Sequence, residues 1–388
     1  MEAGSPLDRM FLIGVACIGL IIIVKRHFSW SNLVKDNIWT ALLIIYMLIS
    51  ISWSDIPFVS LKRWIRELVA IIMVIFVATE SDPQKALLCI FRRMIYVMMP
   101  FSLLLIKYYP LLGVNYAHWS GMMMWTGVAQ HKNGLCGLCL LTIFYLVWTF
   151  MRRWKGQDIP VIWYQKYVEV FLLFLSIYIF MGPYHTLKNS ATATVSLSIG
   201  LMALIGFSWI NKHGKIISAN ILMLIITIII VYGIITPFIG GLSVIDITSV
   251  FGREEDLTGR ADIWKILLPD ALEKPFLGHG FGGFWTDAIR EKNITVTHNG
   301  SLEVILNMGF VGLFLFSMFM IKNCRNAQRE MNRDYDWGVL WFCILLMSTL
   351  QNITEASMAS LSSQKVAILM IFNVTIASYG TKNIAKNV

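Results

Sequence analysis

The sequence predicts an all-α polytopic membrane protein with about eleven transmembrane helices. Hydrophobic residues make up 57% of the 388 residues and charged residues only 14%, and the mean hydropathy is +0.66, whereas a soluble domain carries about 25% charged residues. The apolar residues also fall into separate blocks, most of them near the length of about 20 residues that crosses a bilayer. No soluble domain or internal repeat interrupts the blocks, so we expect one integral membrane domain over residues 1–388.

The apolar blocks follow one another along the whole chain, with mostly short polar segments between them. The first block is followed by Lys25 and Arg26 and by no small-residue cleavage site, so we interpret it as a retained helix and not as a removed signal peptide. The blocks are Met10–Val24, 38–54, 64–79, 88–106, 134–150, 168–184, 191–210, 216–238, 302–321, 337–350 and 366–380.

The distribution of Lys and Arg predicts the orientation of the chain. One alternate set of connecting segments holds 18 of these residues and the other set, without the long loop at 239–301, holds 8. Positive residues favour the cytoplasmic side, so we expect the loop at 239–301 to face the extracytoplasmic side. The formal charge of +9 therefore has a topological explanation. It does not indicate a nucleic-acid partner, because no basic run or soluble domain is present to bind one.

The loop at 239–301 holds the polar residues most suited to chemistry, and we expect short helices within it. Thr258 is a suitable N-cap for a helix that carries Arg260 in its first turn. Gly278–Phe284 holds four glycines, which allow tight turns and a close approach to a partner. Thr297 is a suitable cap for a helix with His298 and Asn299 in its first turn. We interpret this loop as the catalytic region.

Several charged and polar side chains lie on the predicted outer side, where cations oppose the usual topology. Ionisable groups at or within the membrane are functional candidates by default, and these can converge on one outward-facing pocket for an anionic ligand. The candidates are Lys62, Arg63, Arg66, His131, Lys132, Lys188, Arg260, His298, Asn299 and Glu355.

Two of these candidates suggest specific chemistry, and each has a structural alternative. Arg260 and the N–H groups of its helix can bind a phosphate, but Arg260 can also pair with an acidic residue within 254–256. His298 can act as a general base, because an imidazole titrates near neutral pH. It can also be a polar group at the end of a membrane helix.

The other polar motifs have equally plain alternatives. Lys62, Arg63 and Arg66 either clamp a phosphate or extend to the membrane interface. A zinc site would need His279, His298 and His131, but no short ligand spacing supports it, so we expect no metal and no cofactor. Six cysteines lie within or beside apolar segments, and no disulfide is required.

Three segments in the same order resemble the signature loop of the O-antigen ligase and Wzy-type polysaccharide polymerase superfamily. They are TGRADIW (258–264), PFLGHGFGGF (275–284) and HNGSLEVILNMGFVGLF (298–314). The corresponding family patterns are T-G-R-x-x-x-W, P-x-x-G-x-G-x-G and H-N-x-x-L-E. Further segments resemble the ExoQ-type branch, which is associated with exopolysaccharide: WSDIPFVSLKR (53–63), HKN (131–133), LKNSATA (187–193) and NITEAS (352–357).

The resemblance implies a metal-independent, inverting glycosyltransferase of the bacterial inner membrane. Its donor would be a glycan on undecaprenyl pyrophosphate, its acceptor another glycan or a lipid-linked acceptor, and its surroundings membrane lipids with a flippase and a chain-length regulator. By this analogy Arg260 holds the donor pyrophosphate, and His298 deprotonates or orients the acceptor hydroxyl. Lys188 stands where ligases tend to carry an Arg, so it supplies charge without a bidentate fork.

Three functions remain open at this point. The first is a polymerase of lipid-linked repeat units, which makes exopolysaccharide or O-antigen. The second is a ligase that transfers glycan to lipid A core or another acceptor by the same chemistry. The third, from a different class, is a transporter of a lipid-linked sugar, but a transporter favours repeated halves, and the sequence has no repeat.

Overall fold

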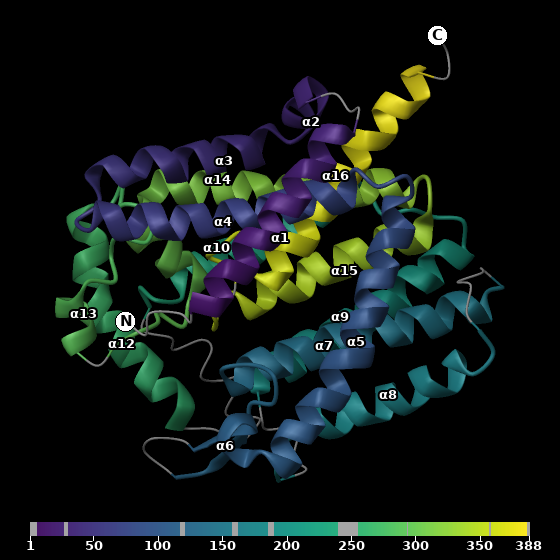
Figure 1. Ribbon diagram of the computed structural model, residues 1–388, viewed down its shortest axis with the longest axis horizontal. Helices are drawn as coiled ribbons and strands as arrows, with labels where there is room; N and C mark the ends of the chain where they lie inside the picture. Colours follow the sequence, from purple (N-terminus) through teal and green to yellow (C-terminus); the bar gives the residue numbers. More distant parts are fainter. Residues whose placement is uncertain are drawn as a thin grey trace. The chain divides into compact units, whose positions relative to one another are not determined.

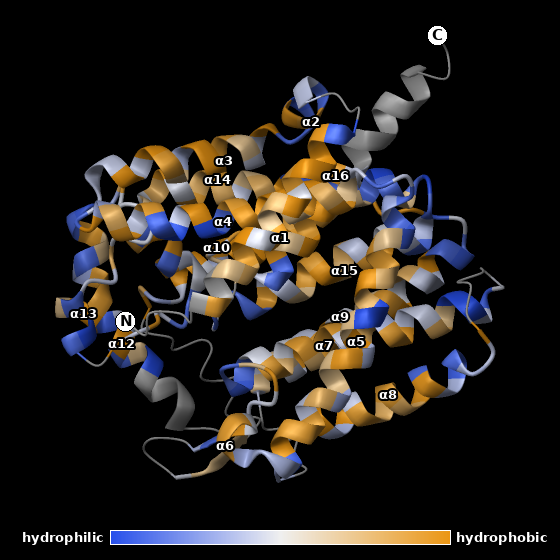
Figure 2. Cartoon of the chain, in the orientation of Figure 1, coloured by the Kyte–Doolittle hydropathy of each residue, from blue (hydrophilic) through white to orange (hydrophobic). Residues whose placement is uncertain are grey.

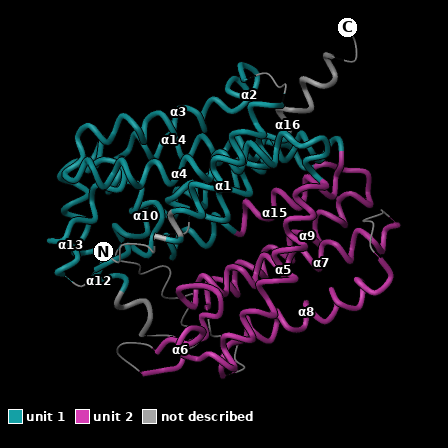
Figure 3. Tube along the Cα trace, in the orientation of Figure 1, with its two compact units in different colours: residues 1–84, 217–333, 348–388 teal, residues 85–216, 334–347 magenta. Residues whose placement is uncertain are grey.

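The computed structural model describes residues 6–26, 30–116, 121–156, 162–184, 190–239, 255–292, 294–356 and 358–385. All of the apolar blocks coincide with helices, so the prediction of an all-helical membrane protein is confirmed. The chain divides into two compact units, drawn in teal and magenta in Figure 3. Unit 1 comprises residues 1–84, 217–333 and 348–388, and unit 2 comprises residues 85–216 and 334–347.

Unit 1 is a bundle of helices built from three separate parts of the chain. Helix α14 packs against α10 and α3, and α4 packs against α1 and α16. Because α3 contacts both α14 and α4, it runs beside each of them (Figure 1). Its elements are α1 (Pro6–Lys25), α2 (Trp30–Asp36), α3 (Ile38–Ile49), the 3₁₀ turn η1 (Ser50–Trp53), α4 (Pro57–Ala78), α10 (Ala219–Ile235), α12 (Glu255–Glu273), α13 (Asp287–Glu291), α14 (Gly300–Met331) and α16 (Gln364–Ala385).

Unit 2 is organised around α7, which is buried along most of its length and packs against α8 and α9. A short antiparallel pair of strands, which the sequence does not predict, pairs Val114 with Trp125. The elements are α5 (Pro83–Tyr108, whose first two residues belong to unit 1), α6 (Pro110–Gly113), β1 (Val114–Tyr116), β2 (Met123–Trp125), α7 (Lys132–Trp154), α8 (Gln165–Met181), α9 (Ala191–Lys212) and most of α15 (Tyr335–Gln351).

Four helices in the described part of the chain are long and apolar enough to cross a membrane: α5, α7, α9 and α14. The bent pair of α1 and α2 makes a fifth when the two are counted as one span. The remaining apolar helices are shorter or more polar, and the total of about eleven spans stays a prediction. Figure 2 shows the apolar residues along these helices and the polar residues mainly at helix ends and in the connecting segments.

Helix α14 is interrupted at Gly309, whose φ of 63° and ψ of −167° are not helical. In a continuous helix the carbonyl of Leu306 accepts a hydrogen bond from the N–H of Phe310. Here the loop between α12 and α13 supplies other partners: the N–H of His279 donates to Leu306 at 2.9 Å, and the N–H of Phe310 donates to the carbonyl of Pro275 at 2.8 Å. The loop backbone therefore replaces the hydrogen bonds that the break removes.

Two glycines permit this contact between the loop and the helix. Gly278 has a φ of +66°, and a Cβ atom there would lie 2.6 Å from the backbone nitrogen of Gly309. A Cβ on Gly309 would lie 2.2 Å from the carbonyl oxygen of Phe276. This is the close backbone approach that the glycine cluster predicts. The cluster thus holds the loop against the membrane helix that follows the candidate base, His298.

Candidate functional site

His298 lies immediately before α14 and not within its first turn, so the prediction that Thr297 caps this helix is wrong. The cap is Asn299, whose side-chain oxygen accepts from the N–H of Leu302 at 2.8 Å. The amide of Asn299 donates to the carbonyls of Gly233 and Ile353. Asn299 is completely buried and fastens the start of α14 instead of presenting a polar group to the surface.

The backbone of His298 adopts a φ of +52°. Among the described residues, no other residue except glycine has a positive φ. Such a conformation is uncommon for a residue with a Cβ atom and persists where neighbouring contacts enforce it. Here the residues on either side enforce it, because the hydroxyl of Thr297 donates to the carbonyl of Asn299 at 2.8 Å and accepts from the N–H of Asn299 at 3.2 Å. The backbone of His298 is therefore held at the start of the helix.

Arg260 lies in the second turn of α12, because the helix begins at Glu255 and not at Thr258 as the sequence predicts. Its guanidinium pairs with Glu355 at 3.5 Å, and both side chains are largely buried. One turn later, the indole N–H of Trp264 donates to the carbonyl of Thr297 at 2.8 Å. These contacts gather α12, the segment before α14 and the segment after α15 in one region.

Three of the predicted residues, Arg260, His298 and Glu355, therefore belong to one constellation in unit 1. Arg260 does make an ion pair, but with Glu355, which the sequence suggests as a separate binding residue. The side chains of residues 254–256, the partners that the sequence suggests, lie outside the described residues. Arg260 also does not lie in the first turn of its helix, which removes the argument that the helix N-terminus assists it.

A cavity of about 470 Å³ lies between α4, α14 and the loops that precede α14 and α16. Its size is within the range of about 300–1,000 Å³ that is usual for small-molecule sites. The lining residues are Arg63, Arg66, Glu67, Phe281, Gly282, Trp285, Thr295, Val296, Glu303, Val304, Asn307, Met308, Ala356, Ala359, Ser360 and Ser362. Arg260, His298 and Glu355 are not among the lining residues, and the cavity approaches this constellation through Val296, two residues before His298, and Ala356, one residue after Glu355.

Two of the three predicted arginine and lysine residues on α4 line this cavity. Arg66 is exposed and forms no hydrogen bond or ion pair with the described residues. Arg63 donates to the carbonyl of Gly282. The positive charge of Arg290 repels the Arg63 guanidinium, whereas the carboxylate of Glu303 attracts it. Lys62 does not line the cavity and instead lies 4.3 Å from the ring centre of Phe58.

The loop between α15 and α16 is held against α4 by Glu67, a buried carboxylate. The hydroxyls of Ser360 and Ser362 donate to its Oε1 atom at 2.8 and 2.9 Å, and the N–H of Ser362 donates to Oε2 at 2.5 Å. Glu67 thus ties this loop to α4, and no ion pair between Glu67 and Arg66 is found among the described residues.

Glu303 and Asn307 line the same cavity from α14, and neither is among the candidate residues predicted from the sequence. The Oε1 atom of Glu303 accepts from the indole N–H of Trp285 at 2.6 Å and from the amide of Asn307 at 3.0 Å. Glu303 is the last residue of the H-N-x-x-L-E pattern, so that motif contained the signal. Asn307 follows one helical turn later and has no such motif.

The remaining predicted residues are not among those that line this cavity in the described part of the chain. His131 and Lys132 belong to unit 2, and Lys188 lies outside the described residues. His279 contacts Asp55 at 3.3 Å through Nδ1 and the carbonyl of Asp270 at 3.2 Å through Nε2. These contacts give His279 a role in holding the glycine-rich loop.

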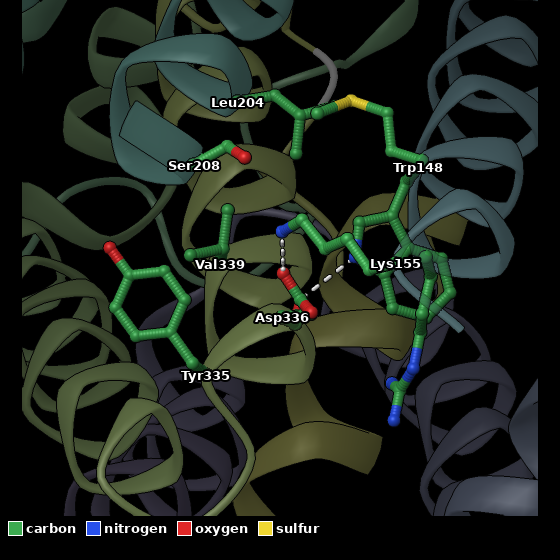
Figure 4. A pocket seen from close by; sticks show the side chains of 9 residues that line it. Trp148, Lys155, Leu204, Ser208, Tyr335, Asp336 and Val339 are labelled. Atoms are coloured by element: carbon green, nitrogen blue, oxygen red, sulfur yellow. Dashed lines mark hydrogen bonds and ion pairs between the residues drawn. The ribbon is translucent and has the colours of Figure 1, made fainter. Parts of the chain in front are cut away.

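A second hollow, in unit 2, is too small for a substrate (Figure 4). Its volume of about 10 Å³ is roughly that needed for one water molecule. The amine of Lys155 contacts Asp336 at 2.7 Å, and the indole N–H of Trp148 donates to the backbone carbonyl of Asp336 at 2.8 Å. We interpret these contacts as structural, because they join α7 to α15.

Comparison with known proteins supports the resemblance noted from the sequence. Residues 171–317 match the family described as O-antigen ligase, a range that includes Arg260, His298 and Glu303. The chain is also 21% identical over 298 residues to the exopolysaccharide production protein ExoQ of Rhizobium meliloti (strain 1021). That alignment covers 73% of this chain and 63% of the relative, so the chain spans less than two thirds of that protein's length. The predicted resemblance to the O-antigen ligase and Wzy-type superfamily, in an ExoQ-like branch, is confirmed.

Proposed function

Starting from the O-antigen ligase domain at residues 171–317, we propose that this protein polymerises oligosaccharide repeat units carried on undecaprenyl pyrophosphate. The reaction takes place at the periplasmic face of a bacterial inner membrane and yields exopolysaccharide or O-antigen. The cavity beside the Arg260, His298 and Glu355 constellation carries this proposal, because it combines a suitable volume with the available charge of Arg66.

In this reaction a hydroxyl oxygen of the acceptor glycan attacks the anomeric carbon of the donor glycan. The new glycosidic bond forms while the bond from that carbon to the diphosphate breaks, and the lipid diphosphate leaves with the electron pair. Direct displacement inverts the anomeric centre. Arg63 and Arg66 stabilise the charge that develops on the diphosphate, as fixed cations do in a partly enclosed site.

His298 is the base that receives the acceptor proton in this proposal, since imidazole titrates near neutral pH. Arg260 is a second ligand of the donor diphosphate. In the structure Glu355 holds the Arg260 guanidinium, and we expect the diphosphate to displace that carboxylate when the donor binds. The charges of the protein supply the stabilisation, so the proposed mechanism requires no metal.

A ligase is the second candidate, because the matched family is described as O-antigen ligase. It would use the same glycosyl transfer and differ in its acceptor, which would be lipid A core or another lipid or protein. As a polymerase, the protein would act after a flippase has delivered the lipid-linked unit and beside a regulator of chain length.

The test is deletion of the gene followed by complementation with the wild type, His298→Ala or Arg260→Ala. Membrane levels of each variant are measured by immunoblot, and glycans are separated by length. Loss of long chains with accumulation of single lipid-linked units supports a polymerase. Long chains that form but do not reach their acceptor support a ligase. Normal polymer from both variants at normal protein levels would refute the assignment of the site.

A further inference from the structure

One wall of the unit 1 cavity carries a second kind of chemistry, which the arginines do not supply. Glu303 and Asn307 lie one turn apart on α14, and the ring of Trp285 lines the cavity beside them. Trp285 and Asn307 both donate to the Oε1 atom of Glu303, at 2.6 and 3.0 Å. These three side chains are therefore held in one fixed arrangement, which we call the α14 wall.

The α14 wall holds two hydrogen-bond acceptors that the described residues do not satisfy: Oε2 of Glu303 and Oδ1 of Asn307. The orientation of the Asn307 amide follows from its partners, since its nitrogen donates both to the carbonyl and to the carboxylate of Glu303, which can only accept. Thr297 lies beside the carboxylate with both its hydroxyl and its backbone N–H. Its single hydroxyl proton is donated to the carbonyl of Asn299, and the approach of the N–H leaves Oε2 of Glu303 without a hydrogen bond of normal geometry.

Buried acceptors without a donor are uncommon and cost free energy, so a pair of them on one cavity wall requires an explanation. A ligand with two neighbouring hydroxyl groups can donate one hydrogen bond to each acceptor. A pyranose ring has this pattern, and its apolar face suits an aromatic ring such as that of Trp285. A phosphate does not fit this wall, because an anion would meet the carboxylate of Glu303.

We propose that the α14 wall binds a pyranose of the acceptor glycan through adjacent hydroxyl groups, which donate to Glu303 and Asn307 while the ring packs on Trp285. The α4 side of the cavity, with Arg63 and Arg66, binds the donor diphosphate. The identity of the ligand as an acceptor rests on the proposed function, whereas the binding of the sugar does not require catalysis. The cavity thus has a hydroxyl-binding side and an anion-binding side.

The test uses two probes on the full chain in lipid nanodiscs. The first is a set of fluorescently labelled oligosaccharides from partial acid hydrolysis of the host's own extracellular polysaccharide, which carry no diphosphate. The second is geranyl diphosphate, which carries no sugar. Binding is measured for the wild type, Glu303→Gln, Asn307→Leu, Arg66→Ala and Glu291→Gln. Glu291 is exposed at the end of α13, so its substitution is a matched control for Glu303→Gln.

We expect Glu303→Gln and Asn307→Leu each to weaken oligosaccharide binding by about ten-fold or more, the loss expected for one hydrogen bond to a buried polar or charged group. Binding of geranyl diphosphate should change less than about two-fold in both, which also shows that the variants are folded. Arg66→Ala should give the reverse pattern, and Glu291→Gln should leave both affinities unchanged.

The proposal is overturned if the wild type binds none of the oligosaccharides, or if the two α14 variants bind them as well as the wild type does. It is also overturned if both variants lose the two probes equally, because the wall would then be only structural. Oligosaccharide binding that depends on Glu303 in a chain without transferase activity would sustain the α14 wall and refute the proposed function, so the two failures are distinguishable.

Discussion

Substitution of Gly309 by Ala tests whether the glycine-rich loop holds the interrupted helix α14 together. The change adds one methyl group at a residue with a φ of 63° and a ψ of −167°, a region of backbone conformation that essentially only glycine occupies. The new Cβ atom would lie 2.2 Å from the carbonyl oxygen of Phe276. That contact is with backbone, so the loop itself must move.

The expected loss of stability follows from two contributions. A non-glycine residue in this conformation costs about 1–3 kcal/mol. Movement of the loop breaks the hydrogen bonds from Phe310 to Pro275 at 2.8 Å and from His279 to Leu306 at 2.9 Å, each worth about 0.5–1.5 kcal/mol. Together these predict a loss of about 2–6 kcal/mol, and we expect an apparent melting temperature lower by about 2–7 °C.

The assay heats the detergent-solubilised protein to a series of temperatures and measures by size-exclusion chromatography the fraction that remains folded. Gly14→Ala on α1 is the matched control, since an added Cβ at that residue meets no atom within 4 Å and alanine favours a helix over glycine by about 1 kcal/mol. We expect the control to melt at or above the wild-type temperature. A Gly309→Ala protein that is as stable as the wild type would refute the argument that the loop and the helix must touch here.

Two further substitutions test contacts beside the site. Trp264→Phe removes the indole N–H that donates to the carbonyl just before His298, which leaves a buried acceptor unpaired at a cost of about 1–3 kcal/mol. We therefore expect less polymer per inserted protein in the complementation assay. Unchanged polymer synthesis would contradict a role of Trp264 in positioning His298. Burial acts to raise the pKa of Asp55, but hydrogen bonds and charge from Lys274 and His279 outweigh it and hold that pKa below its ordinary value. The folded state thus gains stability from the Asp55 charge above about pH 4 and loses it as the pH falls through the lowered pKa. Melting curves of Asp55→Asn should show a weaker loss of stability in acid than the wild type, and an equal loss would exclude this contribution.

Much of the local structure could be predicted from the chain itself. Long apolar blocks form helices because a bilayer or an apolar core leaves the backbone groups no partner except one another, and each predicted block does coincide with a helix. The glycine cluster likewise predicts a close backbone approach. Helix starts were less predictable, since Thr258 and Thr297 are good caps by residue type, but Asn299 caps α14.

Composition and order along the chain determined that this protein is a helical membrane protein, that its polar residues concentrate at 239–301 and that its signature resembles polysaccharide polymerases and ligases. Only the tertiary structure decided which cations share a cavity, that Glu355 holds Arg260, and that Glu303 and Asn307 face the same space as Arg63. The physical reason is sequence distance: Arg63 contacts Gly282 across 219 residues, and no local pattern of residue types encodes a contact of that range.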